Sequence, residues 1–182
     1  LDFFQVGEHA PLADFVADPQ AHPLDTPSGR VELSSAAYAR TGYPATPTAR
    51  VMHLDEGYPL RLITPKSRYR IHSQNSNIPW FREREAQALW IHPRDAEARG
   101  IGDRTEVLVT SPQGRVRIAA KVTDDIMPGV VCLLEGVWPS RDAEGVDTAG
   151  ASNTLTSTEP TMPSQSSRTH SVAVQVAAWV TP

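Results

Sequence analysis

The stretch TEVLVTSPQGRVRIAAKVT, residues 105–123, decides the fold of this chain. Two segments alternate apolar and polar residues, and the turn Ser-Pro-Gln-Gly separates them, which is the pattern of a β-hairpin. Val107 and Val109 share one face of the first strand, and Val116 and Ile118 share one face of the second. The sequence therefore predicts two antiparallel strands with one buried face.

Further strands are predicted on both sides of this hairpin. PLRLIT (59–64), ALWIHP (88–93) and the closing SVAVQVAAWV (171–180) are extended and apolar. PGVVCLLEG (128–136) is apolar almost throughout, so it is expected to be buried on both faces. The chain is therefore expected to be mainly β, and its 40% hydrophobic and 21% charged residues are typical of a globular protein.

Helices are predicted to be short. FREREAQ (81–87) has a helical composition, and PRDAEARG (93–100) combines a proline at the first helical position with a glycine at its end. His92 directly precedes this second helix and is expected to cap its start. In TPSGRVELSS (26–35) a turn leads into a short strand, and SAAYAR (35–40) follows as a helical turn.

The amino-acid composition of the chain changes near residue 58. Prolines at positions 11, 19, 23, 27, 44 and 47 interrupt the first part, so residues 1–57 are predicted to form an irregular arm from a preceding domain. Residues 58–182 are predicted to form the β domain. The opening LDFFQVGEHAPL has neither a basic region nor an initiator methionine, and we interpret the chain as a piece of a longer protein.

Several chemical classes are disfavoured by the sequence. The histidines, at positions 9, 22, 53, 72, 92 and 170, show no metal-binding spacing, so no metal site is expected. Glycine-rich phosphate loops and the G-x-S-x-G nucleophile motif are absent, and the single Cys132 is expected to be a buried core residue. The 17 Lys and Arg are scattered, and no apolar run has the length of a membrane span, so neither nucleic acid nor direct membrane insertion is expected.

Two polar segments remain to be explained. RYRIHSQNSNIPW (68–80) follows the first strand and carries six uncharged hydrogen-bonding side chains within residues 72–77. Residues 140–171 are poor in large apolar side chains, so this segment is expected to be either disordered or functional. Such side chains suit the edges of a pterin or guanine ring, and ASNTLTS (151–157) has the same composition.

The order and spacing of these segments resemble the C-terminal cofactor-binding domain of the dimethyl sulfoxide reductase family of molybdenum enzymes. The likeness runs from TPSGRVELSS through PLRLITPKSRYRIHSQNSN and the hairpin to GASNTLTSTEPTMPSQSSRTHSVAVQV, roughly four fifths of the chain. The motifs EGVW, Asn-x-Leu-Thr and the final His-Ser are similar to those of the anaerobic type of catalytic subunit. The resemblance implies a six-stranded double-psi β-barrel with short flanking helices and an irregular N-terminal arm.

The resemblance also implies which residues touch the cofactor, bis(molybdopterin guanine dinucleotide) with molybdenum or tungsten. The implied contacts are Thr64, Arg70, His72, Ser73 and Gln74 in the first segment, and Asn153, Thr154, His170 and Ser171 in the second. Arginine and hydroxyl groups suit a pyrophosphate, while His and Gln suit the ring edges. At Ser166, where the family tends to carry a glycine, this sequence departs from the family pattern.

No catalytic residue and no metal ligand are assigned to this chain, because in the family the pterins hold the metal together with a ligand from another domain. The resemblance implies one part of an oxidoreductase of the S- or N-oxide reductase type, which transfers an oxygen atom, and a fragment that is inactive alone. The implied partners are the remaining domains of the same subunit, an iron–sulfur electron-transfer subunit and a membrane anchor. The implied location is bacterial, either on the exported, periplasmic side of the membrane or in the cytoplasm.

An alternative stays open at this stage, namely a double-psi barrel that binds a nucleotide or a protein partner without molybdenum. Such a module needs no pairing of the His-Ser-Gln and Asn-x-Leu-Thr segments around one pocket. A small barrel that binds nucleic acid would need basic residues interleaved with aromatic ones, and only the SRYR run (67–70) has that character.

Overall fold

The computed structural model describes residues 12–49, 54, 56–162 and 165–180. The chain divides into two compact units, residues 1–50 and 51–182. The boundary expected between residues 57 and 58 therefore falls inside the second unit. His9, His53 and most of the opening LDFFQVGEHAPL stretch lie outside the described residues.

The described part of the first unit contains two short helices. α1 spans Ala13–Ala17 and α2 spans Ala36–Ala39. Ser35 caps the start of α2, because its hydroxyl oxygen accepts a hydrogen bond of 3.2 Å from the Tyr38 amide. The helical turn predicted over 35–40 is therefore confirmed.

The turn predicted at the start of TPSGRVELSS is confirmed, but the short strand that should follow it is wrong. Gly29 adopts φ +67° and its amide donates to the Thr26 carbonyl at 2.9 Å, which closes the turn. Val31 and Leu33 are 60% and 79% exposed, so no buried face holds the next residues extended. Residues 26–35 contain no strand.

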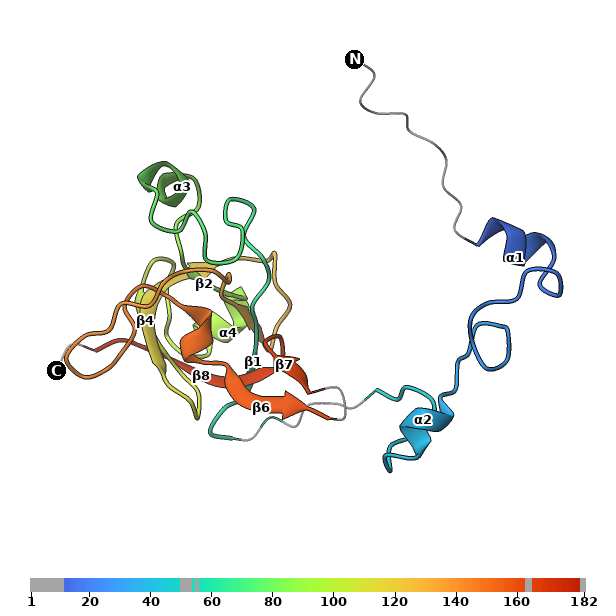
Figure 1. Ribbon diagram of the computed structural model, residues 1–182. Coiled ribbons are helices and arrows are strands. Elements are labelled where there is room, and N and C mark those ends of the chain that lie inside the picture. Colours follow the sequence, from blue (N-terminus) through green and yellow to red (C-terminus); the bar gives the residue numbers. More distant parts are fainter. Residues whose placement is uncertain (1–11, 50–53, 55, 163–164, 181–182) are drawn as a thin grey trace, which may run out of the picture. The chain divides into compact units, whose positions relative to one another are not determined.

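The second unit is built on a closed barrel of six strands (Figure 1). The strands are β1 Leu60–Ile63, β2 Leu89–Ile91, β3 Glu106–Thr110, β4 Arg115–Val122, β5 Val130–Cys132 and β8 Val172–Ala178. Around the barrel they follow the order β1, β5, β2, β4, β3, β8. β1 runs parallel to β5 and β2 runs parallel to β4, while all other neighbours are antiparallel. The mainly β barrel expected from the sequence is confirmed, with two parallel pairs that a simple up-and-down barrel lacks.

The β3–β4 hairpin supplies one wall of the barrel core. Val107 lies opposite Ile118 and Val109 lies opposite Val116, and all four side chains are at most 7% exposed. Side chains at every second position of a strand point to the same face, so both strands turn their valine and isoleucine residues inward. The shared faces predicted from the alternation are confirmed.

β5 is buried on both faces, as predicted. Val131 belongs to the barrel core, whereas Cys132 packs outside it in a second, smaller apolar cluster. The strand itself spans Val130–Cys132, so it is shorter than the apolar run 128–136. Burial raises the pKa of the Cys132 thiol to about 11, and the positive charge of Lys121 opposes that shift.

Two short helices flank β2. α4 spans Pro93–Glu97 and starts as predicted, since Nδ1 of His92 accepts a hydrogen bond of 3.1 Å from the amide two residues later. α3 spans Pro79–Arg84, so it begins and ends earlier than the sequence predicts. The helix stops early because Glu85 and Gln87 bind inside the domain instead. No helix in the described part of the chain is long and apolar enough to cross a membrane.

The polar segment 140–171 is folded over its described residues rather than disordered. A single 3-10 turn, η1, spans Ser152–Thr154, and β6 Ser157–Thr161 pairs with β7 Ser166–Arg168 in a separate two-stranded sheet. Leu155 between them is fully buried in the barrel core. Val146, at 2% exposed, is buried as well, so a few apolar side chains anchor a segment that is mostly polar.

Candidate functional site

The ends of β1 and β5 and the start of β8 meet at one edge of the barrel. β1 and β5 are parallel, and their pairing continues beyond the strands because the Glu135 amide donates to the Pro65 carbonyl at 3.0 Å. β8 is antiparallel to β1, so it begins at the same edge. Both polar segments found in the sequence therefore start or end here.

Thr64 and His170 are in contact at this edge. Thr64 is 1% exposed, its amide donates to Nδ1 of His170 at 3.3 Å, and its hydroxyl donates to the Thr169 carbonyl at 2.7 Å. Because Nδ1 accepts a hydrogen bond, the neutral His170 ring carries its proton on Nε2, where it can donate to a ligand. Ser171, the next residue, is exposed. The structure thus brings three predicted contact residues together.

Arg70 is buried and holds other parts of the chain. Its side chain is 6% exposed and pairs with the Glu85 carboxylate at 3.4 Å. The guanidinium also donates to the Gln87 side-chain oxygen at 3.2 Å and to the Glu135 carbonyl at 3.3 Å. Burial lowers the pKa of Arg70, and Glu85 opposes that shift. Contact between Arg70 and a pyrophosphate stays a prediction, and most of its donors already have partners.

Gln87 joins three segments through its side-chain amide. The nitrogen donates to the Leu134 carbonyl at 2.8 Å and to the Gly150 carbonyl at 2.9 Å, while the oxygen accepts from Arg70. Glu85 binds the Ser67 hydroxyl as well as Arg70. These bonds tie the loop after β1 to the chain after β5, which is why the helix α3 ends before them.

The loop of His72 lies against the chain that follows β5. Nδ1 of His72 is 3.5 Å from a carboxylate oxygen of Glu135, and the Trp138 indole nitrogen donates to the Ser73 carbonyl at 2.7 Å. The His72 side chain is 70% exposed, and Gln74 is exposed as well. The loop therefore presents the predicted His-Ser-Gln side chains to the surface while its backbone is held.

Backbone strain marks the same loop. His72 and Asn75 have φ values of +53° and +70°, which are uncommon outside glycine. Gly136 lies so close that a Cβ atom there would be 1.9 Å from the His72 carbonyl oxygen. Strained residues of this kind persist only where surrounding contacts determine them, and they cluster at functional sites.

Asn153 and Thr154 lie on η1, next to the β3–β4 turn. A Cβ atom at Gly114 in that turn would be 2.6 Å from the Thr154 carbonyl oxygen, so the two backbones touch. Asn153 is exposed, and its carbonyl accepts a hydrogen bond of 3.3 Å from the Thr156 hydroxyl. Among the described residues, no hydrogen bond or ion pair links these two residues to the His72 loop.

A buried carboxylate shapes the segment between β5 and η1. Asp147 is fully buried and accepts hydrogen bonds from the amides of Ser140 at 2.8 Å, Ala149 at 3.0 Å and Ala151 at 2.5 Å. Three amide donors stabilise an ionised carboxylate that would otherwise be costly to bury. Sequence reasoning missed Asp147, since an aspartate followed by small residues also fits an exposed turn.

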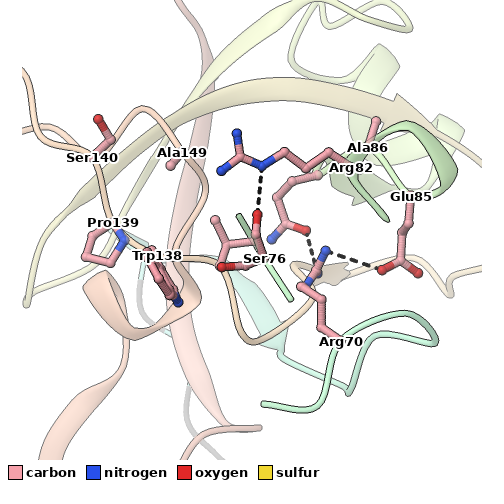
Figure 2. A pocket seen from close by; sticks show the side chains of 11 residues that line it. Arg70, Ser76, Arg82, Glu85, Ala86, Trp138, Pro139, Ser140 and Ala149 are labelled. Atoms are coloured by element: carbon pink, nitrogen blue, oxygen red, sulfur yellow. Dashed lines mark hydrogen bonds and ion pairs between the residues drawn. The ribbon is translucent and has the colours of Figure 1, made fainter. Parts of the chain in front are cut away.

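A pocket of about 610 Å³ lies between these segments (Figure 2). Its lining residues are Arg70, Ser76, Arg82, Glu85, Ala86, Gln87, Val137, Trp138, Pro139, Ser140 and Ala149. Of the nine predicted contact residues, only Arg70 lines it. Ser76 and Trp138 lie in the polar run SQNSN and the motif EGVW, which could have indicated their place in the site. Nothing in the sequence distinguished Arg82.

Comparison with protein families gives one match over most of the barrel. Residues 60–173 match the model described as "Molydopterin dinucleotide binding domain". The chain is 36% identical over 186 residues to dimethyl sulfoxide reductase DmsA of Escherichia coli, covering 93% of this chain and 23% of that protein. It is 36% identical over 150 residues to trimethylamine-N-oxide reductase of Haemophilus influenzae, covering 74% of this chain and 18% of that protein. The chain thus spans less than a quarter of these relatives.

A solved structure with the same fold is acetylene hydratase from Pelobacter acetylenicus. The TM-score is 0.73 at 18% sequence identity, over 89% of this chain and 25% of that one. At that identity the likeness concerns the fold alone. It supports the closed barrel described above.

Proposed function

Because the chain belongs to the molybdopterin dinucleotide-binding domain family, we propose that its loops at the β1–β5 edge hold part of a bis(molybdopterin guanine dinucleotide) cofactor. One observation carries the proposal: exposed polar side chains sit on a strained loop whose backbone lies against Gly136 and is hydrogen-bonded by Trp138, while its His72 side chain contacts Glu135. A ligand with many donors and acceptors in one plane needs such fixed polar groups.

The residues at this edge fit a pterin or guanine ring. His72, Ser73 and Gln74 offer uncharged donors and acceptors at the surface, and Nε2 of His170 is directed to donate. Asn153, Thr154 and Ser171 would add further amide and hydroxyl groups. Within the described residues, the Ser76 hydroxyl is buried without a hydrogen-bond partner, whereas the buried Glu135 carboxylate oxygen lies 3.5 Å from Nδ1 of His72. An unpaired buried hydroxyl is rare in a complete structure, so its presence favours a bound group.

In this proposal the cofactor and the protein chain have separate roles. The cofactor, with molybdenum or tungsten, supplies the redox chemistry when bound. The chain binds and orients it: His72 and Gln74 hydrogen-bond the ring edges, and Thr64 keeps the His170 ring in place. Arg70 acts by holding the loop after β1 against the chain after β5. No residue of this chain is proposed as catalytic or as a metal ligand.

The proposal extends to the longer protein. The names of the relatives, dimethyl sulfoxide reductase and trimethylamine-N-oxide reductase, favour an oxidoreductase that transfers an oxygen atom from an S- or N-oxide. In that protein the remaining domains complete the cofactor site, so this chain alone is inactive. We further propose an iron–sulfur electron-transfer subunit and a membrane anchor as partners. The proposed location is bacterial, on the exported side of the membrane or in the cytoplasm.

The alternative of a barrel that binds a partner without molybdenum has less support, because the matched family is defined by dinucleotide binding. Metal and pterin analysis decides between the two. The longest natural chain that contains this segment is purified without oxygen, and molybdenum, tungsten, pterin and guanine nucleotide are measured. About one metal per chain with guanine nucleotide is expected for a cofactor domain, whereas a folded protein free of metal and pterin would contradict the proposal.

Variants of the same longer protein test the residues. His72→Ala and Asn153→Ala are each expected to weaken cofactor retention by about threefold to tenfold, because each removes hydrogen bonds to the ligand. The melting temperature of the barrel should change little, since both side chains are exposed. His22→Ala, an exposed histidine in the first unit, is the matched control. Loss of folding without specific cofactor loss would show that the residues are structural.

A further inference from the structure

The pocket of Figure 2 has a positive charge that the chain does not neutralise. Three ionised side chains line it, namely Arg70, Arg82 and Glu85. Arg70 and Glu85 pair with each other at 3.4 Å, so two positive charges and one negative charge leave one positive charge on Arg82. Arg82 lines the pocket, and its positive charge attracts an anion there.

Arg82 is held at one nitrogen and has the others available. Its Nε donates to the Ser76 carbonyl at 2.7 Å, which fixes the plane of the guanidinium. Figure 2 shows its two terminal nitrogens turned toward the wall formed by Pro139, Ser140 and Ala149. In the described residues neither terminal nitrogen makes a hydrogen bond or an ion pair. A planar guanidinium in this state suits an oxygen-rich anion.

Ser76 provides a second and independent sign of a ligand. The residue is 8% exposed, it lines the pocket, and its hydroxyl is buried without a hydrogen-bond partner among the described residues. A buried hydroxyl without a partner is destabilising, so native structures rarely contain one. Ser76 and Arg82 are neighbours in the pocket, because the Ser76 carbonyl oxygen accepts the hydrogen bond from Nε of Arg82 (Figure 2).

We infer that this pocket binds an oxoanion of the phosphate type, held by the terminal nitrogens of Arg82 and the hydroxyl of Ser76. The wall of Val137, Trp138 and Pro139 is mostly apolar and would cover the rest of a larger ligand. The same chemistry fits a free oxoanion or the phosphate of a nucleotide. The nucleotide source rests on the proposed function, whereas the free oxoanion does not.

The test measures binding of orthophosphate, GDP and guanosine to the 182-residue chain by titration calorimetry. Arg82→Gln is expected to weaken binding of the phosphate-bearing probes by about tenfold, because hydrogen bonds from a charged donor are lost. Ser76→Ala should weaken it by about threefold. Arg84→Gln is the matched control on the same helix. The guanidinium carbon of Arg84 lies 4.7 Å from the centre of the Trp80 ring, and Arg84 does not line the pocket.

Melting temperatures separate a ligand site from a structural role. Ser76→Ala removes a hydroxyl that has no partner, so the unliganded chain should melt at the same temperature or higher. A structural hydroxyl would instead lower the melting temperature when removed. Weaker phosphate binding together with unchanged melting supports the site.

The probes also identify the source of the anion. If GDP binds more tightly than orthophosphate and guanosine does not bind, the site is assigned to a nucleotide phosphate. If GDP and orthophosphate bind equally, the site is assigned to a free oxoanion. A folded chain that binds neither at millimolar concentration, or variants that bind as wild type, would overturn the site. A chain that binds phosphate through Arg82 while the longer protein lacks metal and pterin keeps this site and contradicts the proposed function.

Discussion

The barrel interior and the loops at the β1–β5 edge are stabilised in different ways. The interior is filled by aliphatic side chains from all six strands, many of them fully buried. The loops are held by individual polar atoms, such as the side-chain amide of Gln87 and the carboxylate of Asp147. Apolar burial is non-directional, so the interior depends on volume, whereas each loop contact depends on one donor and one acceptor.

Two arginines show the same difference within one pocket. Arg70 is buried and bound to Glu85, Gln87 and Glu135, so it acts as part of the scaffold. Arg82 is exposed, is fixed only through the Ser76 carbonyl, and has donors left for a ligand. Residue type alone therefore does not separate a structural arginine from a binding one; the number of partners already present does.

The strongest test of this comparison is a charge in the interior. Val131→Asp is expected to lower the free energy of unfolding by about 5 kcal/mol, close to the whole stability of a small domain, because a buried carboxylate would have no partner. Val31→Asp, at a position 60% exposed, is the matched control and should change the stability little. Urea unfolding measures both, and a soluble Val131→Asp chain that melts cooperatively would show that β5 is misplaced.

A second test addresses the contact between the two loops. Gly136→Ala is expected to lower the free energy of unfolding by about 3 kcal/mol for two reasons. The new Cβ would overlap the His72 carbonyl oxygen, and the positive φ of this position is unfavourable for alanine. Gly129→Ala is the matched control, since Gly129 also has a positive φ of +80° but open space around it. Its cost should be only about 1 kcal/mol. Equal losses in the two variants would show that the close approach to His72 is unimportant.

The smallest expected effect concerns pH and the cluster outside the barrel. The pKa of Cys132 is raised to about 11 in the folded chain, so the unfolded chain loses this proton first as pH rises. Stability from this group is present below about pH 9 and is lost by about 2 kcal/mol as the pH approaches 11. Urea unfolding across this range checks the loss, and Cys132→Ala should remove it. An identical pH dependence in wild type and Cys132→Ala would show that the thiol is not buried in solution.

Local sequence signals predicted the strands that carry the fold. The alternation in residues 105–123 specified both the β3–β4 hairpin and the inward faces of its strands. His92 and Pro93 specified the start of α4, because capping and the fixed φ of proline are local effects. The strand expected after Gly29 was wrong for the opposite reason: alternation favours a strand only where a partner and a buried face exist.

The candidate site was predictable only in part. Sequence reasoning found the polar loop after β1, and the family resemblance pointed to Thr64 and His170 separately. Their contact came only from the structure, which pairs β1 with β8 in antiparallel fashion. It placed Arg70 among groups free to bind a ligand, whereas the structure gives the guanidinium three internal partners. It missed Arg82 and Gln87, because nothing local distinguishes them from other polar residues near a short helix.

The sequence by itself determined the segments that form the six barrel strands, the main polar loops, and that those loops suit a ligand with many hydrogen-bonding edges. The tertiary structure alone decided which polar side chains are occupied and which are available. The reason is distance along the chain: the partners of Arg70, Gln87 and Trp138 lie up to 65 residues away, and the strand order of the barrel brings them together.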